Sequence, residues 1–184
     1  MNLFLRLLVV FIRASFSKQR IGILDEARLS YRVWLTDQDM FAHMTNSRYL
    51  SFSDLGTINY IMRTGSWKIL RKRRWFPVIC AQSMTISRML TTPEKFEIVS
   101  KITGWTDTYV GLSHKFYRDE REHAEVRVIA RFASKDKSKV PPQAMIDAVG
   151  SDITSPVLPA EFIAMIEDLE QARARSKAQS NITT

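Results

Sequence analysis

Four segments in the second half of the chain alternate apolar and polar residues with a period of two, the pattern of half-buried strands. Only short turns separate them, and they cover residues 78–89, 96–105, 110–117 and 124–132. Strands joined by short turns pair antiparallel, because a parallel connection needs a crossover of a dozen residues or more. An earlier alternating stretch, 28–36, predicts a fifth strand. We therefore expect one antiparallel sheet.

Residues 47–64 lie between the first strand and the other four, and their apolar positions have helical spacing. Between residues 48 and 62 the only charged side chains are Arg48 and Asp54. A helix that is apolar on nearly all sides must be covered over most of its circumference. The predicted fold class is therefore α+β: a single domain in which an antiparallel β-sheet is curled around a central long α-helix.

Regions outside this core have different compositions. We expect an apolar and basic amphipathic helix over residues 1–22 and the domain itself over 23–140. A C-terminal extension with a second amphipathic helix is expected over 141–175, followed by a disordered polar tail over 176–184. A length of 184 residues fits one domain with such helical extensions at both ends.

The N-terminal segment is apolar, but Arg6 and Arg13 interrupt it and leave an uninterrupted apolar run of six residues. A spanning helix needs ~20 residues, and neither a positive n-region nor an A-x-A-like site indicates a signal peptide. The apolar face either contacts a membrane interface or packs on the domain, leaving both arginines in water. In the second case the packed side chains would be Leu3, Phe4, Leu7, Leu8 and Phe11. We expect the first, a peripheral membrane contact through residues 1–20.

The net charge of +8 is concentrated in two places. Residues 1–20 contain four basic side chains and no acidic one, and residues 67–75 contain five and none. A nucleic-acid site would also need a recognisable binding motif, and none is present, so we expect no nucleic-acid partner.

A single cysteine, Cys80, excludes an intramolecular disulfide and suits a reducing compartment. We expect a cytoplasmic protein, peripheral at the inner face of the membrane.

Residues 37–49 contain the densest group of reactive side chains, with Asp37, Asp39 and His43 on one short polar turn. A helix that begins near Asn46 would direct its free N–H groups and the positive end of its dipole at this turn. Hydrolysis of an ester or thioester requires such a pair of features: a carboxylate that activates water or attacks the carbonyl, and N–H groups that hold the oxyanion. A metal site is disfavoured, since only three ligands lie here without calcium-loop spacing, and we expect no metal or other cofactor.

Three motifs carry a resemblance to a known family: His43-Met-Thr-Asn-Ser-Arg-Tyr-Leu50, Gly104-Trp-Thr-Asp107 and Leu158-Pro-Ala160. Together with the order of the predicted elements, they resemble the hotdog-fold thioesterases of the 4-hydroxybenzoyl-CoA thioesterase-like superfamily. The likeness is greatest to the group containing thioesterase superfamily member 6 and its bacterial relatives, and it covers nearly the whole chain. It implies a hotdog domain, an acyl-CoA substrate hydrolysed to the free acid and CoA, and a homodimer whose two subunits form the site together.

The resemblance also implies roles for individual residues. Asp39 is the catalytic carboxylate by motif position, as nucleophile or general base, unless it only caps the turn. His43 would orient Asp39 or line the thioester pocket, unless it is a hydrogen-bonded structural residue. Asn46 would donate a hydrogen bond to the substrate carbonyl, or it is the helix N-cap. Asp37 is expected to be structural, closing the end of the first strand.

A second group of side chains is expected to contact the substrate. Its members are Thr45, Ser47 and Tyr49 near the turn, Asp54 in the helix, and Arg71, Arg73 and Arg74 in the basic run. The arginines are candidates for the phosphates of CoA, although cations at a helix C-terminus are also stabilised by the helix dipole. Asp54, predicted inside a covered helix, is the second candidate for the catalytic acid. Tyr49 is the member for which packing is the stronger interpretation.

Two positions depart from the family motif. Ala42 stands where the family has Gly, and Thr45 stands where it has the first Asn of a pair. Because Ala tolerates a positive φ poorly, the turn geometry could differ. These departures keep open a non-catalytic acyl-binding or membrane-associated hotdog protein as the alternative function. A dehydratase or hydratase of this fold is less favoured, since its histidine and acid have a different spacing.

Overall fold

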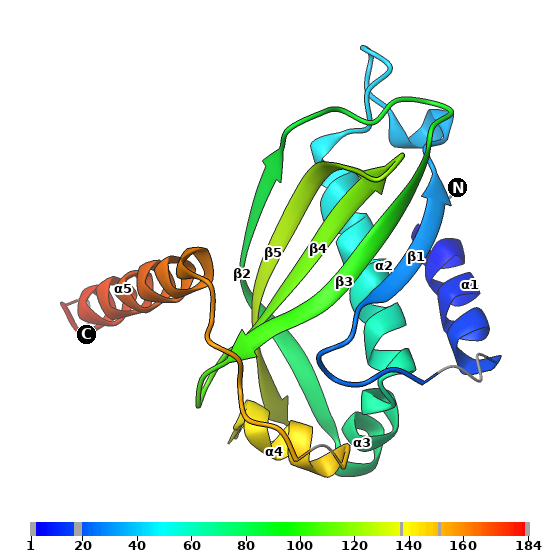
Figure 1. Ribbon diagram of the computed structural model, residues 1–184. Coiled ribbons are helices and arrows are strands. Elements are labelled where there is room, and N and C mark those ends of the chain that lie inside the picture. Colours follow the sequence, from blue (N-terminus) through cyan, green and yellow to red (C-terminus); the bar gives the residue numbers. More distant parts are fainter. Residues whose placement is uncertain (1–2, 17–19, 137, 151, 183–184) are drawn as a thin grey trace.

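A computed structural model describes residues 3–16, 20–136, 138–150 and 152–182 (Figure 1). The helices are α1 (Leu3–Phe16), α2 (Asn46–Arg63), α3 (Ser66–Arg73), α4 (Pro142–Ala148) and α5 (Ala160–Ile182), with a short 3₁₀ helix η1 (Leu35–Asp37). The strands are β1 (Ala27–Arg32), β2 (Trp75–Ile86), β3 (Lys95–Trp105), β4 (Val110–Arg118), β5 (Arg121–Ser134) and β6 (Lys139–Val140).

All strand pairs are antiparallel, in the order β1-β3-β4-β5-β2, with β6 beside β5. The sheet curls around α2, and α1 lies beside α2 at the β1 side of the sheet (Figure 1). This arrangement confirms the predicted α+β fold, with an antiparallel sheet around a central long helix and helical extensions at both ends. Strand β2 is an edge strand, because it pairs only with β5 among the described residues.

The core lies between α2 and the concave face of the sheet. Phe52 of α2 is 1% exposed, and its ring meets that of Phe96 on β3 edge to face, with the centroids 5.0 Å apart. Helix and sheet approach closely at Gly56, where an added Cβ would lie 2.5 Å from Oγ of Ser100. The covered side of α2 explains why the sequence has so few charges there.

Helix α1 packs on α2 through a face that contains a charge. Arg6, Val10 and Ala14 follow one another at intervals of four residues, and all three are buried. The packing alternative, which left both arginines in water, is therefore wrong for Arg6, whereas Arg13 is exposed. Among the described residues, no helix combines the length and the apolar content needed to cross a bilayer.

The apolar side chains of α1 mostly face outward. Of the residues that the packing alternative assigned to the domain surface, Leu7 is half-buried. The exposed ones are Phe4, Leu8 and Phe11. Leu3 begins the helix, but its side chain lies outside the described part, as do residues 1–2 and 17–19 of the predicted membrane segment.

Several element boundaries differ from the predictions. β1 ends at Arg32, well before residue 36, because the chain turns into η1. Thr64 is the C-cap of α2, and Gly65, with φ of 80°, is the N-cap of α3. The predicted disordered tail over 176–184 is wrong over its described part, since α5 continues to Ile182; residues 183–184 lie outside the described part.

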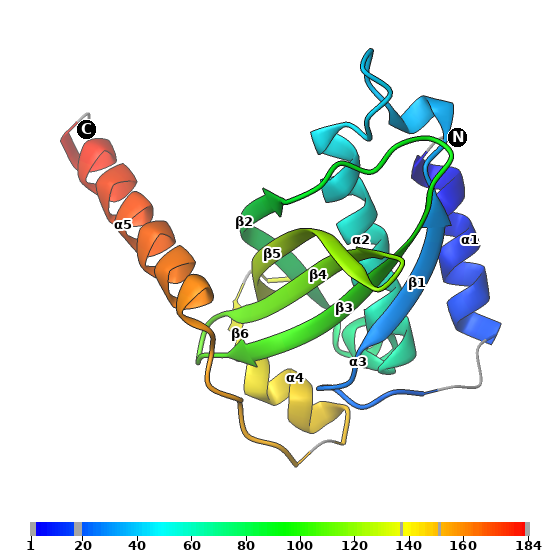
Figure 2. The same cartoon turned by 45° about the horizontal axis from the view of Figure 1, so that its top comes forward.

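Helix α5 attaches to the outer face of the sheet by its first turns and then projects away from the domain (Figure 2). Phe162, 2% exposed, packs on Tyr109 and Ile129. Gly111 makes room for this contact, because a Cβ there would lie 2.8 Å from the Phe162 ring. The opposite glycine across the β3–β4 pair, Gly104, similarly leaves space for the segment leading into α5.

Candidate active site

Residues 37–45 form a narrow hairpin between η1 and α2. The carbonyl of Asp37 accepts a hydrogen bond from the N–H of Thr45 at 2.9 Å, and the N–H of Asp39 donates to the carbonyl of His43 at 2.8 Å. The hairpin is attached to the loop before β3, because the N–H of Met44 donates to the carbonyl of Leu90 at 2.7 Å. The candidate turn thus has a defined position at the start of α2.

The Asp39 carboxylate folds back over its own turn. Its Oδ1 accepts the N–H groups of Phe41 at 2.8 Å and His43 at 3.2 Å. Among the described residues, none donates a hydrogen bond to Oδ2. Asp39 therefore caps the turn with one oxygen and keeps a second oxygen available for other chemistry.

Ala42 adopts φ of 61°. The left-handed conformation costs an alanine on the order of 1 kcal/mol, and the hydrogen bonds of the hairpin offset that cost. Replacement of the family glycine therefore leaves a closed turn in place. His43 is half-buried, and its main-chain N–H and carbonyl form hydrogen bonds with Asp39.

Helix α2 begins one residue earlier than the N-cap interpretation of Asn46 requires. Thr45 is the N-cap and makes no side-chain cap bond, so Asn46 is the first helical residue, and that interpretation is wrong by one position. The hydroxyls of Thr45 and Ser47 are 3.1 Å apart. Asn46 and Ser47 are exposed at the positive end of the helix dipole, where first-turn N–H groups have no acceptor inside the helix.

Tyr49 and Asp54 occupy opposite environments on α2. Tyr49 is fully buried, its hydroxyl accepts the N–H of Leu90 at 3.1 Å, and burial raises the pKa of its phenol. Its position matches the packing interpretation. Asp54 is exposed, contrary to the buried position expected from the sequence, although partial burial raises the pKa of its carboxyl.

The three candidate arginines lie at the far end of α2. Arg71 and Arg73 belong to α3, which follows the C-terminus of α2, and Arg74 is the C-cap of α3. Since α2 has 18 residues and a helix rises 1.5 Å per residue, they are separated from the turn by ~27 Å of helix. All three are exposed, and the Arg73 guanidinium lies 4.8 Å from the centroid of the Trp75 ring. A single protomer does not bring the basic run and the turn together.

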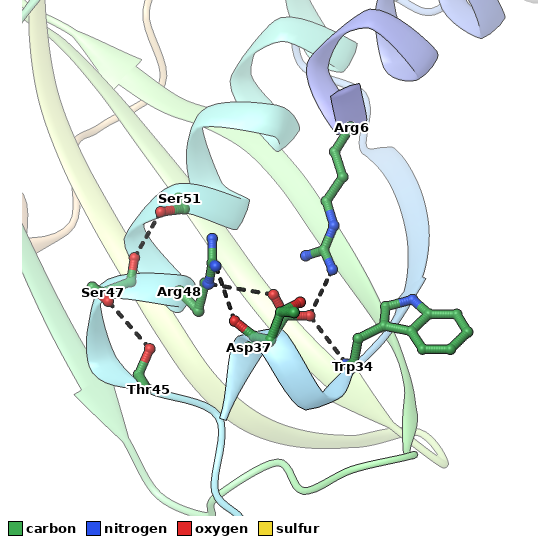
Figure 3. A network of polar contacts seen from close by, with 8 residues as sticks. Arg6, Trp34, Asp37, Thr45, Ser47, Arg48 and Ser51 are labelled. Atoms are coloured by element: carbon green, nitrogen blue, oxygen red, sulfur yellow. Dashed lines mark hydrogen bonds and ion pairs between the residues drawn. The ribbon is translucent and has the colours of Figure 1, made fainter. Parts of the chain in front are cut away.

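A buried ion cluster adjoins the turn (Figure 3). Asp37 is fully buried; its Oδ2 accepts Arg6 Nη2 at 2.6 Å and the N–H of Trp34 at 3.0 Å. Its Oδ1 is 3.3 Å from Nε of Arg48, in the first turn of α2. The Arg6 guanidinium also lies 4.8 Å from the Phe52 ring centroid. Asp37 makes structural contacts, but β1 ends at Arg32, so the prediction that Asp37 closes the end of that strand is wrong, and its cationic partner on α1 was missed.

One sequence signal pointed to this partner. Arg6 shares a helical face with Val10 and Ala14, so a helix that docks through its small apolar face must bury the arginine as well. A buried arginine needs an anionic partner. The sequence prediction placed Arg6 at the outer surface of the helix instead, because basic side chains next to leucines are usually exposed.

Comparisons with known proteins agree with this architecture. Residues 33–150 match the family model described as "Thioesterase-like superfamily". Protein THEM6 of Danio rerio is 31% identical over 113 residues, which cover 61% of this chain and 56% of that protein, so the match spans little more than half of the relative's length.

Two solved structures share the fold at low sequence identity. The probable thioesterase YbaW of Escherichia coli is 14% identical with a TM-score of 0.62, over 66% of this chain and 94% of that one. Slr0204, a 1,4-dihydroxy-2-naphthoyl-CoA thioesterase from Synechocystis, is 12% identical with a TM-score of 0.57, over 68% of this chain and 96% of that one. At these identities the likeness shows the fold alone.

Proposed function

We propose that this chain, which belongs to the thioesterase-like superfamily, is an acyl-CoA thioesterase that hydrolyses its substrate to the free acid and CoA. The observation that carries the proposal is the position of Asp39: its carboxylate is fixed by two N–H groups directly before the free N–H groups of α2. A fixed carboxylate and a helix N-terminus are the two groups that thioester hydrolysis needs.

In this mechanism the thioester carbonyl oxygen faces the first turn of α2. Asp39 Oδ2 takes a proton from water, and the water oxygen attacks the carbonyl carbon. N–H groups of Asn46 and Ser47 stabilise the oxyanion, with the Asn46 amide as a further donor. The intermediate expels the CoA thiolate, which takes up the proton held by Asp39. If Asp39 instead attacks the carbonyl, the C–S bond breaks and the CoA thiolate leaves; water then hydrolyses the mixed anhydride to the free acid and restores the Asp39 carboxylate, and the thiolate takes up the proton that the water gives up. His43, Thr45 and Ser47 would line the thioester pocket.

A homodimer supplies the basic end of this site. Strand β2 has a free edge with Phe76 and Ile79 exposed, and a free edge favours pairing with another strand. If two β2 strands pair antiparallel, the start of one lies beside the end of the other. The run ending at Arg74 directly precedes β2, and the end of β2 leads to the loop that holds the turn. Pairing therefore brings one subunit's arginines toward its partner's Asp39, where they can bind CoA phosphates.

Peripheral contact with the inner face of a membrane, by a cytoplasmic protein, remains part of the proposal. It is supported by a stripe on α1 that includes Leu5, Leu8, Ile12 and Phe16, exposed by 45% or more each. Arg13 on the same helix adds a cation, and anionic lipid attracts such helices through apolar area and basic charge.

One observation favours the alternative of a non-catalytic acyl-binding protein. Asp39 Oδ1 is already used to cap the turn, which is a sufficient structural reason for an aspartate at this position. The two functions make opposite predictions for a variant that keeps the cap and removes the charge.

Asp39→Asn is that variant, since an amide oxygen can still accept both N–H groups. We expect kcat to fall by about 10²-fold or more, because a general base or nucleophile is lost, while the melting temperature changes little. The assay measures the free thiol released from acyl-CoAs of graded chain length. Asp25→Asn is the matched control, because Asp25 also caps a turn, accepting the N–H of Gly22 at 2.7 Å. Full activity in Asp39→Asn with loss in Asp54→Ala would transfer the role to the helix acid.

Mixed dimers test the shared site in the same assay. Subunits carrying Asp39→Asn are mixed with subunits carrying Arg71→Ala, Arg73→Ala and Arg74→Ala. If the site is shared, the mixed dimer contains one site with an intact Asp39 and intact arginines, so activity exceeds that of both parents. Mixtures that never exceed their parents would contradict the shared arrangement.

A further inference from the structure

The buried cluster around Asp37 connects α1 to three parts of the candidate site. Through its side chain, Asp37 binds Arg6 of α1 and Arg48 in the first turn of α2. Through its carbonyl it binds the N–H of Thr45, the N-cap of α2. The segment leading to Asp39 begins at this residue. Asp37 therefore contacts α1 and the first turn of α2 through its carboxylate, and the far end of the hairpin through its main-chain carbonyl.

Arg6 is the part of this cluster that α1 supplies. Its side chain is 1% exposed and that of Asp37 is 0% exposed, so solvent does not screen the pair. Burying two charges is costly unless each has a close partner. The 2.6 Å contact therefore constrains Arg6 and Asp37 to one relative position. A further constraint comes from Arg48, whose Nη2 donates to the carbonyl of Thr36 at 2.9 Å.

We infer that Arg6 and Asp37 are positioning residues of the active site, and that α1 holds the Asp39 turn against the start of α2. They act through the hairpin and touch no substrate. The inference rests on the proposed function where catalysis is its readout, but the positioning of the turn is a property of the fold. It makes the N-terminal helix part of the catalytic unit, whatever surface its outer face contacts.

A purely structural role makes a different prediction. If the ion pair only attaches α1 to the domain, its loss lowers the stability of the whole protein and leaves the turn of each folded molecule unchanged. If the pair positions the turn, its loss changes the turn within molecules that are still folded. Amide hydrogen exchange within the turn and the stability of the whole protein distinguish these two cases.

The first measurement is amide hydrogen exchange, which needs no substrate. In Arg6→Met, an apolar side chain replaces the guanidinium. We expect the amides of Thr45, His43 and Phe41 to exchange about tenfold faster or more, while amides of the β4–β5 pair keep their protection. The matched control is Arg28→Met, which removes a 2.7 Å ion pair to Glu97 on the exposed sheet surface. Unchanged exchange in the turn of Arg6→Met would overturn the inference. Arg6→Lys is measured in the same way if the methionine variant does not fold.

The second measurement compares Arg6→Met and Asp37→Asn with the double variant. Removing both charges leaves neither buried and unpaired, so the double variant should recover part of the melting temperature lost in Asp37→Asn. The ion pair that positions the turn is still absent, so kcat should stay about 10²-fold below wild type, because small displacements of reacting groups cause losses of this size. Recovery of kcat together with stability would mean a structural role only. If the wild-type protein hydrolyses no acyl-CoA, the proposed function fails, and the exchange data alone decide the positioning.

Discussion

The two terminal helices are attached to the domain in opposite ways. α1 buries a charged side chain, Arg6, and exposes apolar ones such as Leu8, which is 46% exposed. α5 buries an aromatic side chain, Phe162, in its first turn, and beyond Arg173 its described side chains are polar or small and exposed. Figure 2 shows α1 beside α2 and α5 extending away from the sheet.

The contrast shows that a terminal helix can be attached to the domain with or without a connection to the candidate site. An ion pair inside the protein is directional, so Arg6 determines how α1 lies relative to Asp37 and the candidate turn. The contact of Phe162 with Ile129 is apolar and lies on the outer face of the sheet, remote from the concave side that holds α2. We therefore expect changes in α1 to alter activity and changes in α5 to alter only stability.

Deletion of residues 1–16 should have the largest effect. It removes Arg6 and leaves the Asp37 carboxylate with the longer ion contact to Arg48 and the N–H of Trp34, and breaking a buried pair costs roughly 3–5 kcal/mol. We expect a loss of this size in the free energy of urea unfolding, together with a loss of kcat. Deletion of residues 174–184 is the comparison, and it should change stability by less than about 0.5 kcal/mol, as surface changes do. Equal effects of the two deletions would break the contrast.

Co-sedimentation of the same proteins with anionic liposomes tests the outer face of α1. If this face contacts lipid, the full-length protein should sediment at low salt, and the deletion should abolish sedimentation. A full-length protein that stays in the supernatant, with a truncation that only unfolds more easily, would assign α1 to the fold alone.

Phe162→Ala should have a smaller effect. Truncating a buried phenylalanine costs about 3 kcal/mol, at the lower end of the usual range, because the site lies on the outer face of the sheet and can relax. Limited proteolysis should then cleave α5 sooner than in wild type. Activity per folded molecule should not change, because no contact of Phe162 leads to the Asp39 turn. A fall in kcat comparable to that of Arg6→Met would show that α5 also supports the site.

Most of the fold was predictable from the sequence because it depends on local patterns. Period-two segments predicted all five long strands, and the scarcity of charges in 47–64 predicted a covered helix that begins within one residue of Asn46. The end of α5 was not predictable from polarity. Residues 176–179 are Ser, Lys, Ala and Gln, and the last three are good helix formers, so the helix continues through them.

The candidate site was predictable only in its local part. The motif identified Asp39 and the start of α2, whose residues are neighbours in sequence. The pair between Arg6 and Asp37 joins positions 31 residues apart, and the sequence around either residue does not indicate which residue is its partner. The same limit applies to Arg74, which lies at the far end of α2 in one protomer and can approach the turn only across a dimer.

The smallest predicted effect concerns the polar attachment of α5 at high pH. The Tyr109 hydroxyl donates a hydrogen bond to the Glu170 carboxylate on α5 and accepts one from Arg173. Burial first, and then the bond to Glu170, raise the pKa of Tyr109 to about 12. Because the folded-state pKa lies above the ordinary value of 10.0, the contribution to stability is complete below pH 10 and is lost as the pH rises toward 12. Tyr109→Phe cannot titrate and lacks the hydrogen bond. We expect the stability advantage of the wild type over this variant, measured by urea unfolding, to shrink between pH 10 and 12 while the activity ratio at neutral pH stays near one. A constant advantage across that range would mean that the hydroxyl does not hold α5, and that the apolar contact of Phe162 attaches the helix alone.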